Sequence, residues 1–156
     1  NLSETARLYG GTVLEKMGSG VGLKYIEQME SAMIRALKEN GFHAPLPFRE
    51  LTKLADGIIG RGNKMGEGWL LTAEMAKLLR SGIDNIVCLQ PFACLPNHVT
   101  GKGMIRELLR TDPQANIIAL DCDADASQVN QMNRIKLMLE IAKEKLQQAE
   151  EKAINA

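Results

Sequence analysis

The sequence predicts a helix-rich, layered α/β domain with a small parallel sheet of the Rossmann-like β-α-β kind and a long C-terminal helix. Residues 86–89 and 117–120 form short apolar runs without alternation, which is typical of strands buried on both faces of a parallel sheet. Between them, residues 104–109 place apolar side chains on one helical face. This order predicts a right-handed crossover, so we expect strands at about 84–90 and 116–121 to be parallel neighbours.

The helices are predicted from apolar residues that recur at helical spacing. Ile26, Met29, Met33 and Leu37 indicate a helix over 21–40, a second helix begins near Leu51, a third starts at Trp69 and ends at Gly82, and the last starts near Ser127, an N-cap candidate. A short helix within residues 1–20 is also expected, although glycines interrupt its pattern. Residues beyond Lys143 are mostly polar, so the end of the last helix should project from the body.

We expect the chain to be one compact domain with two parts. Residues 1–65 form a helical N-terminal part, and residues 66–156 form the β-α-β-α, Rossmann-like part. Five glycines lie between residues 57 and 68, where we expect the most flexible stretch. Because the chain opens with Asn1-Leu2-Ser3 and no initiating Met, we expect a piece of a longer polypeptide.

The composition excludes several classes of function. The 19 Lys and Arg residues balance 19 Asp and Glu residues, so no basic field is available to bind nucleic acid. No apolar run approaches the roughly 20 residues that cross a bilayer, so we expect no membrane partner. Three cysteines without a Cys-x-x-Cys pair, and no N-terminal apolar stretch, predict a cytoplasmic protein.

Two polar loops follow the predicted strands, at residues 90–98 and 121–127. Ligands of open α/β sheets gather beyond the carboxyl ends of the strands. If the strands are neighbours, these loops face each other and bring a thiol, an imidazole and three carboxylates to one edge. Lys102 lies one helical turn beyond His98, so its ammonium group belongs to the same region.

Cys94 is the first candidate residue at this edge. Pro91 and Pro96 flank it and restrict the backbone, which holds the sulfur in a defined direction. Two interpretations stay open for it, a metal ligand or nucleophile and a small buried apolar side chain. Cys88 lies in mid-strand and is expected in the core, and packing is also the favoured role of Cys122.

Other chemistries at this edge are incomplete. His98 follows Cys94 by four residues, but the second half of a zinc site is missing, so a capping or loop-fastening hydrogen bond is its favoured role. Residues 121–125 resemble the start of a calcium loop, but Ala126 and Met132 occupy the positions that need Gly and Glu. We interpret this segment as a solvated acidic loop that starts a helix.

Three segments carry a more specific pattern: GEGWLLTAEM at 66–75, NIVCLQPFACLPNH at 85–98 and SQVNQMNRIKLML at 127–139. They resemble the C-terminal part of the large CoA-substrate-specific enzyme activases, which are related to the activator and subunits of 2-hydroxyacyl-CoA dehydratases. The resemblance covers about residues 25–142. Its most diagnostic motif is Pro-Phe-x-Cys-x-Pro, at residues 91–96.

The resemblance implies an upstream ATPase module that carries an iron–sulfur cluster of the 4Fe-4S kind, followed by a region similar to the dehydratase subunits. In those subunits three cysteines hold a cluster, the last in a Pro-Phe-Gly-Cys loop. Cys94 matches that last cysteine, with Ala93 in the place of glycine. Cys122 stands where the family has an aromatic residue and is not carried over as a ligand. His98 and Lys102 would be nearby donors that offset the charge of a cluster.

Two functions follow as expectations. The first is a fragment, not catalytic alone, of an ATP-driven iron–sulfur activator or electron-transfer protein acting with 2-hydroxyacyl-CoA dehydratases. Its partners would be the upstream domains of the same polypeptide and a dehydratase or electron donor. The alternative is a docking or assembly module without a cofactor. An enzyme with Cys94 as nucleophile and His98 as base lacks a third residue to orient the base.

Overall fold

The computed structural model describes residues 12–123 and 127–154. The contacts within the chain divide it into two units, the first ending at Phe48 and the second beginning at Arg49. The boundary expected after residue 65 therefore falls inside the second unit. Most of the short helix expected within residues 1–20 lies outside the described residues.

The first unit is built on one long helix, α2 (Val13–Glu39). It starts well before the expected residue 21 and runs through Gly18, Gly20 and Gly22, since glycine weakens a helix by only about 1 kcal/mol and does not forbid it. At its end Gly41 adopts a positive φ of 75°, and the N–H of Phe42 donates to the carbonyl of Leu37 at 2.9 Å. This is the glycine stop that the sequence predicts.

The second unit contains the remaining elements. In chain order they are α3 (Phe48–Ala55, which begins at the unit boundary), α4 (Leu70–Arg80), strand β1 (Asn85–Pro91), a π-helical turn (Asn97–Gly101), a 3₁₀ turn (Lys102–Met104), α5 (Ile105–Thr111), strand β2 (Asn116–Cys122) and α6 (Gln128–Ile154). Most of the residues that the structure describes are helical. None of the helices in the described ranges is both long enough and apolar enough to cross a membrane.

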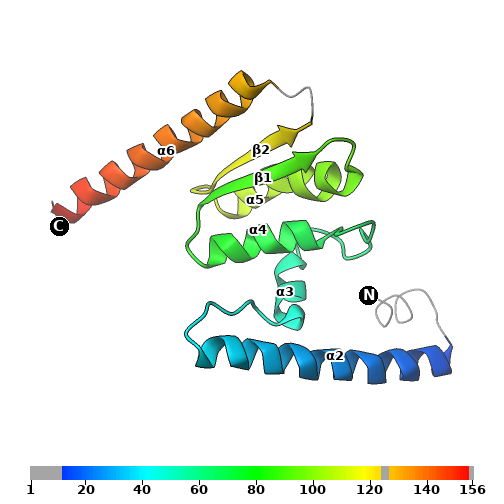
Figure 1. Ribbon diagram of the computed structural model, residues 1–156. Helices are drawn as coiled ribbons and strands as arrows, with labels where there is room; N and C mark the ends of the chain where they lie inside the picture. Colours follow the sequence, from blue (N-terminus) through cyan, green and yellow to red (C-terminus); the bar gives the residue numbers. More distant parts are fainter. Residues whose placement is uncertain (1–11, 124–126, 155–156) are drawn as a thin grey trace. The chain divides into compact units, whose positions relative to one another are not determined.

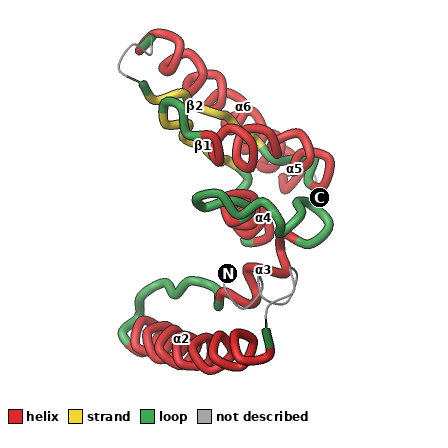
Figure 2. Tube along the Cα trace, turned by 90° about the vertical axis from the view of Figure 1, so that its right-hand side faces the viewer, coloured by secondary structure: helices red, strands yellow, loops and turns green. Residues whose placement is uncertain are grey.

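The two strands form a parallel pair, as predicted. Their register runs from Asn85 opposite Asn116 to Pro91 opposite Cys122. Figure 1 and Figure 2 both place this pair between α4 on one side and α6 on the other. The main core lies on the α4 side, where Met75, Leu79, Ile86, Cys88, Leu108 and Ile117 pack together.

The prediction that both strands are buried on both faces is wrong for β1. Its burial alternates: Ile86, Cys88 and Gln90 are buried, whereas Val87 and Leu89 are 43% and 55% exposed. On β2, by contrast, Ile117, Ala119 and Leu120 are buried and Ile118 is half-buried. The difference arises because α6 packs against β2, so the same face of β1 stays open.

Helix α6 begins where the sequence predicts. The N–H of Asn130 donates to the Ser127 hydroxyl at 3.4 Å, which confirms Ser127 as the N-cap. The helix then runs back along β2 in the opposite direction. The amide of Asn116 donates to the carbonyl of Met138 at 2.9 Å, and Lys145 reaches the carbonyl of Gln114 further along. These bonds hold α6 against β2, on the face of the sheet opposite α4.

Candidate functional site

The two polar loops meet at the carboxyl edge of the sheet. The N–H of Phe92 donates to the carbonyl of Cys122 at 3.2 Å, so the β1 loop starts beside the last residue of β2. The ammonium group of Lys102 lies 3.4 Å from the carboxylate of Asp121 and joins the segment after β1 to the end of β2. Both side chains are more than two-fifths exposed, so this ion pair contributes only a few tenths of a kcal/mol.

Cys94 sits on a tight turn directly after β1. Its N–H donates to the carbonyl of Pro91 at 3.1 Å, and its own carbonyl accepts the N–H of His98 at 3.2 Å. Ala93 has a φ of 54°, a conformation that glycine adopts more easily than alanine. A strained residue next to the cysteine indicates that the surrounding fold imposes this turn.

The sulfur of Cys94 has one polar neighbour that the sequence analysis missed. The side-chain amide of Asn97 donates to Cys94 Sγ at 3.0 Å. The Cys94 side chain is half-buried, so solvent reaches it from part of its surroundings. The three-residue spacing between Cys94 and Asn97 in a helical turn was the available signal, because side chains at that spacing share a face.

The two predicted donors, Lys102 and His98, have contacts of their own near this edge. Lys102 pairs with Asp121 rather than with Cys94. His98 fastens the loop through its backbone N–H, and its imidazole makes no hydrogen bond within the part of the chain that the structure describes. The expected loop-fastening role of His98 therefore belongs to its backbone.

Beneath the loop lies a buried polar layer. Gln90 is 1% exposed, and its amide donates to Cys88 Sγ at 3.1 Å. Gly101 passes so close that a Cβ there would stand 3.1 Å from the same sulfur, which explains glycine at this position. Burial raises the pKa of the Cys88 thiol, and the hydrogen bond from Gln90 opposes that shift only in part. Cys88 is a buried core residue, as predicted.

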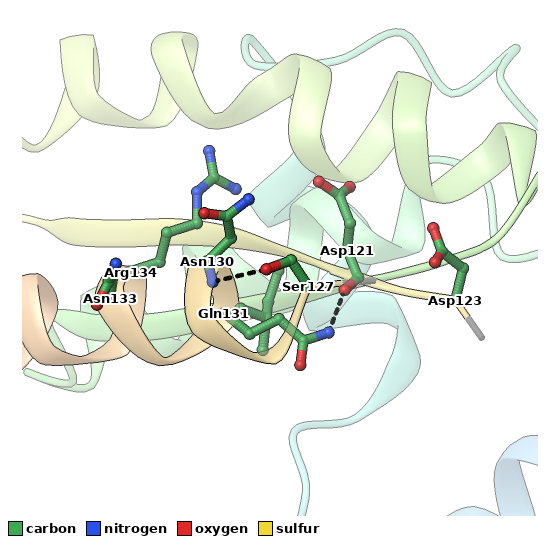
Figure 3. A pocket seen from close by; sticks show the side chains of 8 residues that line it. Asp121, Asp123, Ser127, Asn130, Gln131, Asn133 and Arg134 are labelled. Atoms are coloured by element: carbon green, nitrogen blue, oxygen red, sulfur yellow. Dashed lines mark hydrogen bonds between the residues drawn. The ribbon is translucent and has the colours of Figure 1, made fainter. Parts of the chain in front are cut away.

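A separate shallow pocket of about 550 Å³ opens at the carboxyl end of β2. It is lined by Leu120, Asp121, Asp123, Ser127, Asn130, Gln131, Asn133 and Arg134. Figure 3 shows the carboxylates of Asp121 and Asp123 turned to one side, away from the amide of Gln131. Cys94 does not line this pocket, so the candidate thiol and the acidic residues form two adjacent sites rather than one.

The chain alone does not fit an iron–sulfur cluster. Such clusters take several thiolates, commonly four. The three cysteines are all free: Cys88 is buried, Cys94 half-buried and Cys122 exposed. Among residues 12–123 and 127–154, no group of three or more His, Cys, Asp or Glu side chains is arranged to hold a metal ion. Other thiolates would have to come from elsewhere.

Comparison with protein-family models, with curated proteins and with solved structures found no match to this chain.

Proposed function

We propose that the chain is a domain of a longer, ATP-driven iron–sulfur activator or electron-transfer protein that acts with 2-hydroxyacyl-CoA dehydratases. The domain is not catalytic on its own. The observation that carries the proposal is the placement of Cys94 on a turn at the carboxyl end of β1, with the Asn97 amide 3.0 Å from its sulfur. The Pro-Phe-x-Cys-x-Pro motif of this chain resembles the Pro-Phe-Gly-Cys loop of the dehydratase subunits, and the resemblance implies that Cys94 is a ligand.

In this proposal Cys94 contributes one thiolate, and the upstream domains of the same polypeptide contribute the others. The Asn97 amide would offset part of the negative charge on the sulfur. His98 and Lys102 remain candidates for the surroundings of the cluster, with Lys102 held near the edge by Asp121. The structure has a sheet of two strands, whereas sheets commonly have about four to six. A complete Rossmann-like layering is therefore part of the proposal, with further strands supplied by the longer protein. ATP would bind in the upstream domains.

The test is the iron content of the longer protein after anaerobic reconstitution. Cys94→Ala should lower the iron and sulfide bound per chain, because one ligand is lost. The matched control is Cys122→Ala, which removes an exposed thiol on the neighbouring strand and should leave the iron content unchanged. Circular dichroism must show that both variants are folded. Equal iron in Cys94→Ala and in the unaltered protein would contradict the ligand assignment.

The alternative function is a docking module without a cofactor. It is favoured by the exposed apolar residues of β1, Val87 and Leu89, on a strand that has one neighbour among the described residues. A longer protein that binds no iron, but loses a stable complex when these residues are changed, would support this alternative over the first function.

A further inference from the structure

The outer edge of β2 is capped by side chains of α6. Arg134 donates to the carbonyl of Ala119 at 2.5 Å, and Gln131 donates to the carbonyl of Asp121 at 2.6 Å. In a strand, the backbone groups of alternate residues point to opposite edges. Residues 119 and 121 therefore point away from β1, and α6 occupies their acceptors. A further strand cannot pair there without displacing these bonds.

The outer edge of β1 is open. The carbonyl of Asp84 and the N–H of Phe92 both bond to β2, so even-numbered residues of β1 face β2 and odd-numbered ones face outward. Asn85, Val87 and Leu89 thus direct their N–H and C=O groups to the outer edge, where the carbonyl of Leu89 already accepts the side-chain amide of Gln90 at 3.2 Å. Among the described residues β1 pairs only with β2.

The same odd-numbered residues leave an apolar and uncharged surface. Val87 and Leu89 are 43% and 55% exposed, and β1 contains no charged residue. Natural edge strands are usually protected by charged side chains, bulges or proline. Here the one protective residue of this kind is Pro91, at the very end of the strand.

Helix α6 adds an apolar flank beside this surface. Helical residues are about 100° apart, so Leu139 lies about 140° around the axis from Arg134, with buried Met138 between them. Arg134 reaches the outer edge of β2, so the opposite flank faces the β1 side. Met132 and Leu139 lie on that flank and are 51% and 53% exposed. The flank of α6 on the β1 side therefore carries exposed apolar side chains.

We propose that a second copy of this chain pairs with β1 in antiparallel fashion, across a two-fold axis at Val87. Val87 then lies opposite Val87 of the second copy, and Asn85 lies opposite its Leu89. Each of these residues exchanges hydrogen bonds through its outward N–H and C=O groups, and the carbonyl of Leu89, which already accepts the Gln90 amide, takes the second bond on its other lone pair. Pro91, which has no N–H, falls just outside the paired stretch.

Three observations favour a second copy as the occupant. The edge is uncharged, so two copies meet without like-charge repulsion. Each copy has one open and one capped edge, so pairing stops at a dimer instead of growing into a filament. The two-fold axis is perpendicular to the plane of the sheet. Both α6 helices therefore cover the same face of the resulting four-stranded sheet, with their apolar flanks toward its centre.

The test measures association and amide exchange on the whole chain. Sedimentation over a range of concentrations should show a dimer, and the amides of Val87 and Leu89 should exchange more slowly as the dimer forms. Leu89→Pro removes an outward N–H but none of the bonds to β2, so it should give a folded monomer. If Leu89→Pro does not fold, Val87→Lys serves the same purpose by placing a charge at the centre of the pairing.

Leu89→Lys places a charge on the proposed interface and should weaken the dimer. Leu137→Lys is its matched control. Leu137 is 63% exposed on α6 but lies on the flank away from β1, so its change should leave the dimer intact. A chain that stays monomeric at every concentration would overturn the proposal. Protection of the Val87 and Leu89 amides in a monomer would show another segment on this edge and would overturn it as well. So would a dimer that survives both Leu89→Lys and Val87→Lys.

Discussion

Cys88 and Cys94 are only six residues apart, yet their surroundings differ in kind. Cys88 is buried in the face of β1 that packs on α4, whereas Cys94 is half-buried on the turn that follows the strand. The reactivity of a thiol depends on its access to solvent and on its fraction of thiolate. The two residues therefore offer a direct check on where β1 ends.

Brief alkylation at native pH should label Cys94 well before Cys88. Burial both shields the Cys88 sulfur and raises its pKa, so it presents little reactive thiolate. Mass mapping of the three cysteine peptides measures the order, with exposed Cys122 as the internal reference. Equal labelling of Cys88 and Cys94 would show that the two thiols are equally accessible to solvent and would contradict the assigned end of β1.

The raised pKa of Cys88 also predicts a dependence of stability on pH. In the unfolded chain this thiol ionises near its ordinary pKa of 9.0, while in the folded chain it keeps its proton to higher pH. Between these two values the folded state binds more protons, so the free energy of unfolding must fall as pH rises. Below the unfolded pKa the thiol is protonated in both states, so its contribution does not change with pH.

Urea unfolding at several pH values from neutral to alkaline measures this effect. Cys88→Ala should remove this part of the decline, and Cys122→Ala should keep it, since Cys122 is exposed. An identical alkaline decline in all three proteins would show that Cys88 has no part in it.

At the scale of elements, the placement of α6 decides which strand of the sheet is covered and which stays exposed. The helix covers β2, caps its outer edge through Gln131 and Arg134, and leaves β1 open. Asn116 is the buried link in this arrangement, because its amide donates both to the carbonyl of Met138 on α6 and to the side chain of Asn85 on β1.

Asn116→Ala should destabilise the second unit by about 1–3 kcal/mol, because it leaves the buried carbonyl of Met138 without its donor. The matched control is Asn133→Ala, which changes an exposed asparagine of α6 and should shift stability by about 0.5 kcal/mol or less. Chemical denaturation measures both. An equal effect of the two substitutions would show that the Asn116 bonds do not anchor α6.

At the scale of the whole molecule, the charges cancel and the thiols are few. The formal charge is zero, with 19 residues of each sign. The three cysteines differ in exposure, because Cys88 is buried, Cys94 is half-buried and Cys122 is exposed. A chain of this kind is expected to need other domains for any cluster chemistry.

The isolated chain should therefore stay colourless after anaerobic reconstitution with iron and sulfide. At most Cys94 and Cys122 are available at one edge, and a cluster needs more thiolates. Visible absorbance together with iron analysis measures the outcome. A stable brown chain with bound iron would show that these residues suffice.

The sequence by itself determined where most of the helices and both strands lie, and that the two strands are parallel neighbours, although it placed the start of α2 too late. Apolar spacing, Gly41 and Ser127 are local signals, and a strand–helix–strand order leaves few topologies. It also selected the edge where Cys94 lies. The cluster, the dehydratase partner and the ATPase module stay predictions that rest on the resemblance.

Only the tertiary structure decided which face of β1 is covered and what the site side chains contact. An apolar run reads the same whether or not a helix covers it, so Val87 and Leu89 gave no sign of their exposure. The partners of Lys102 and Cys94, namely Asp121 and Asn97, likewise depend on how the chain turns after β1. Periodicity reports which side chains share a face, whereas burial and pairing depend on which other element packs against that face.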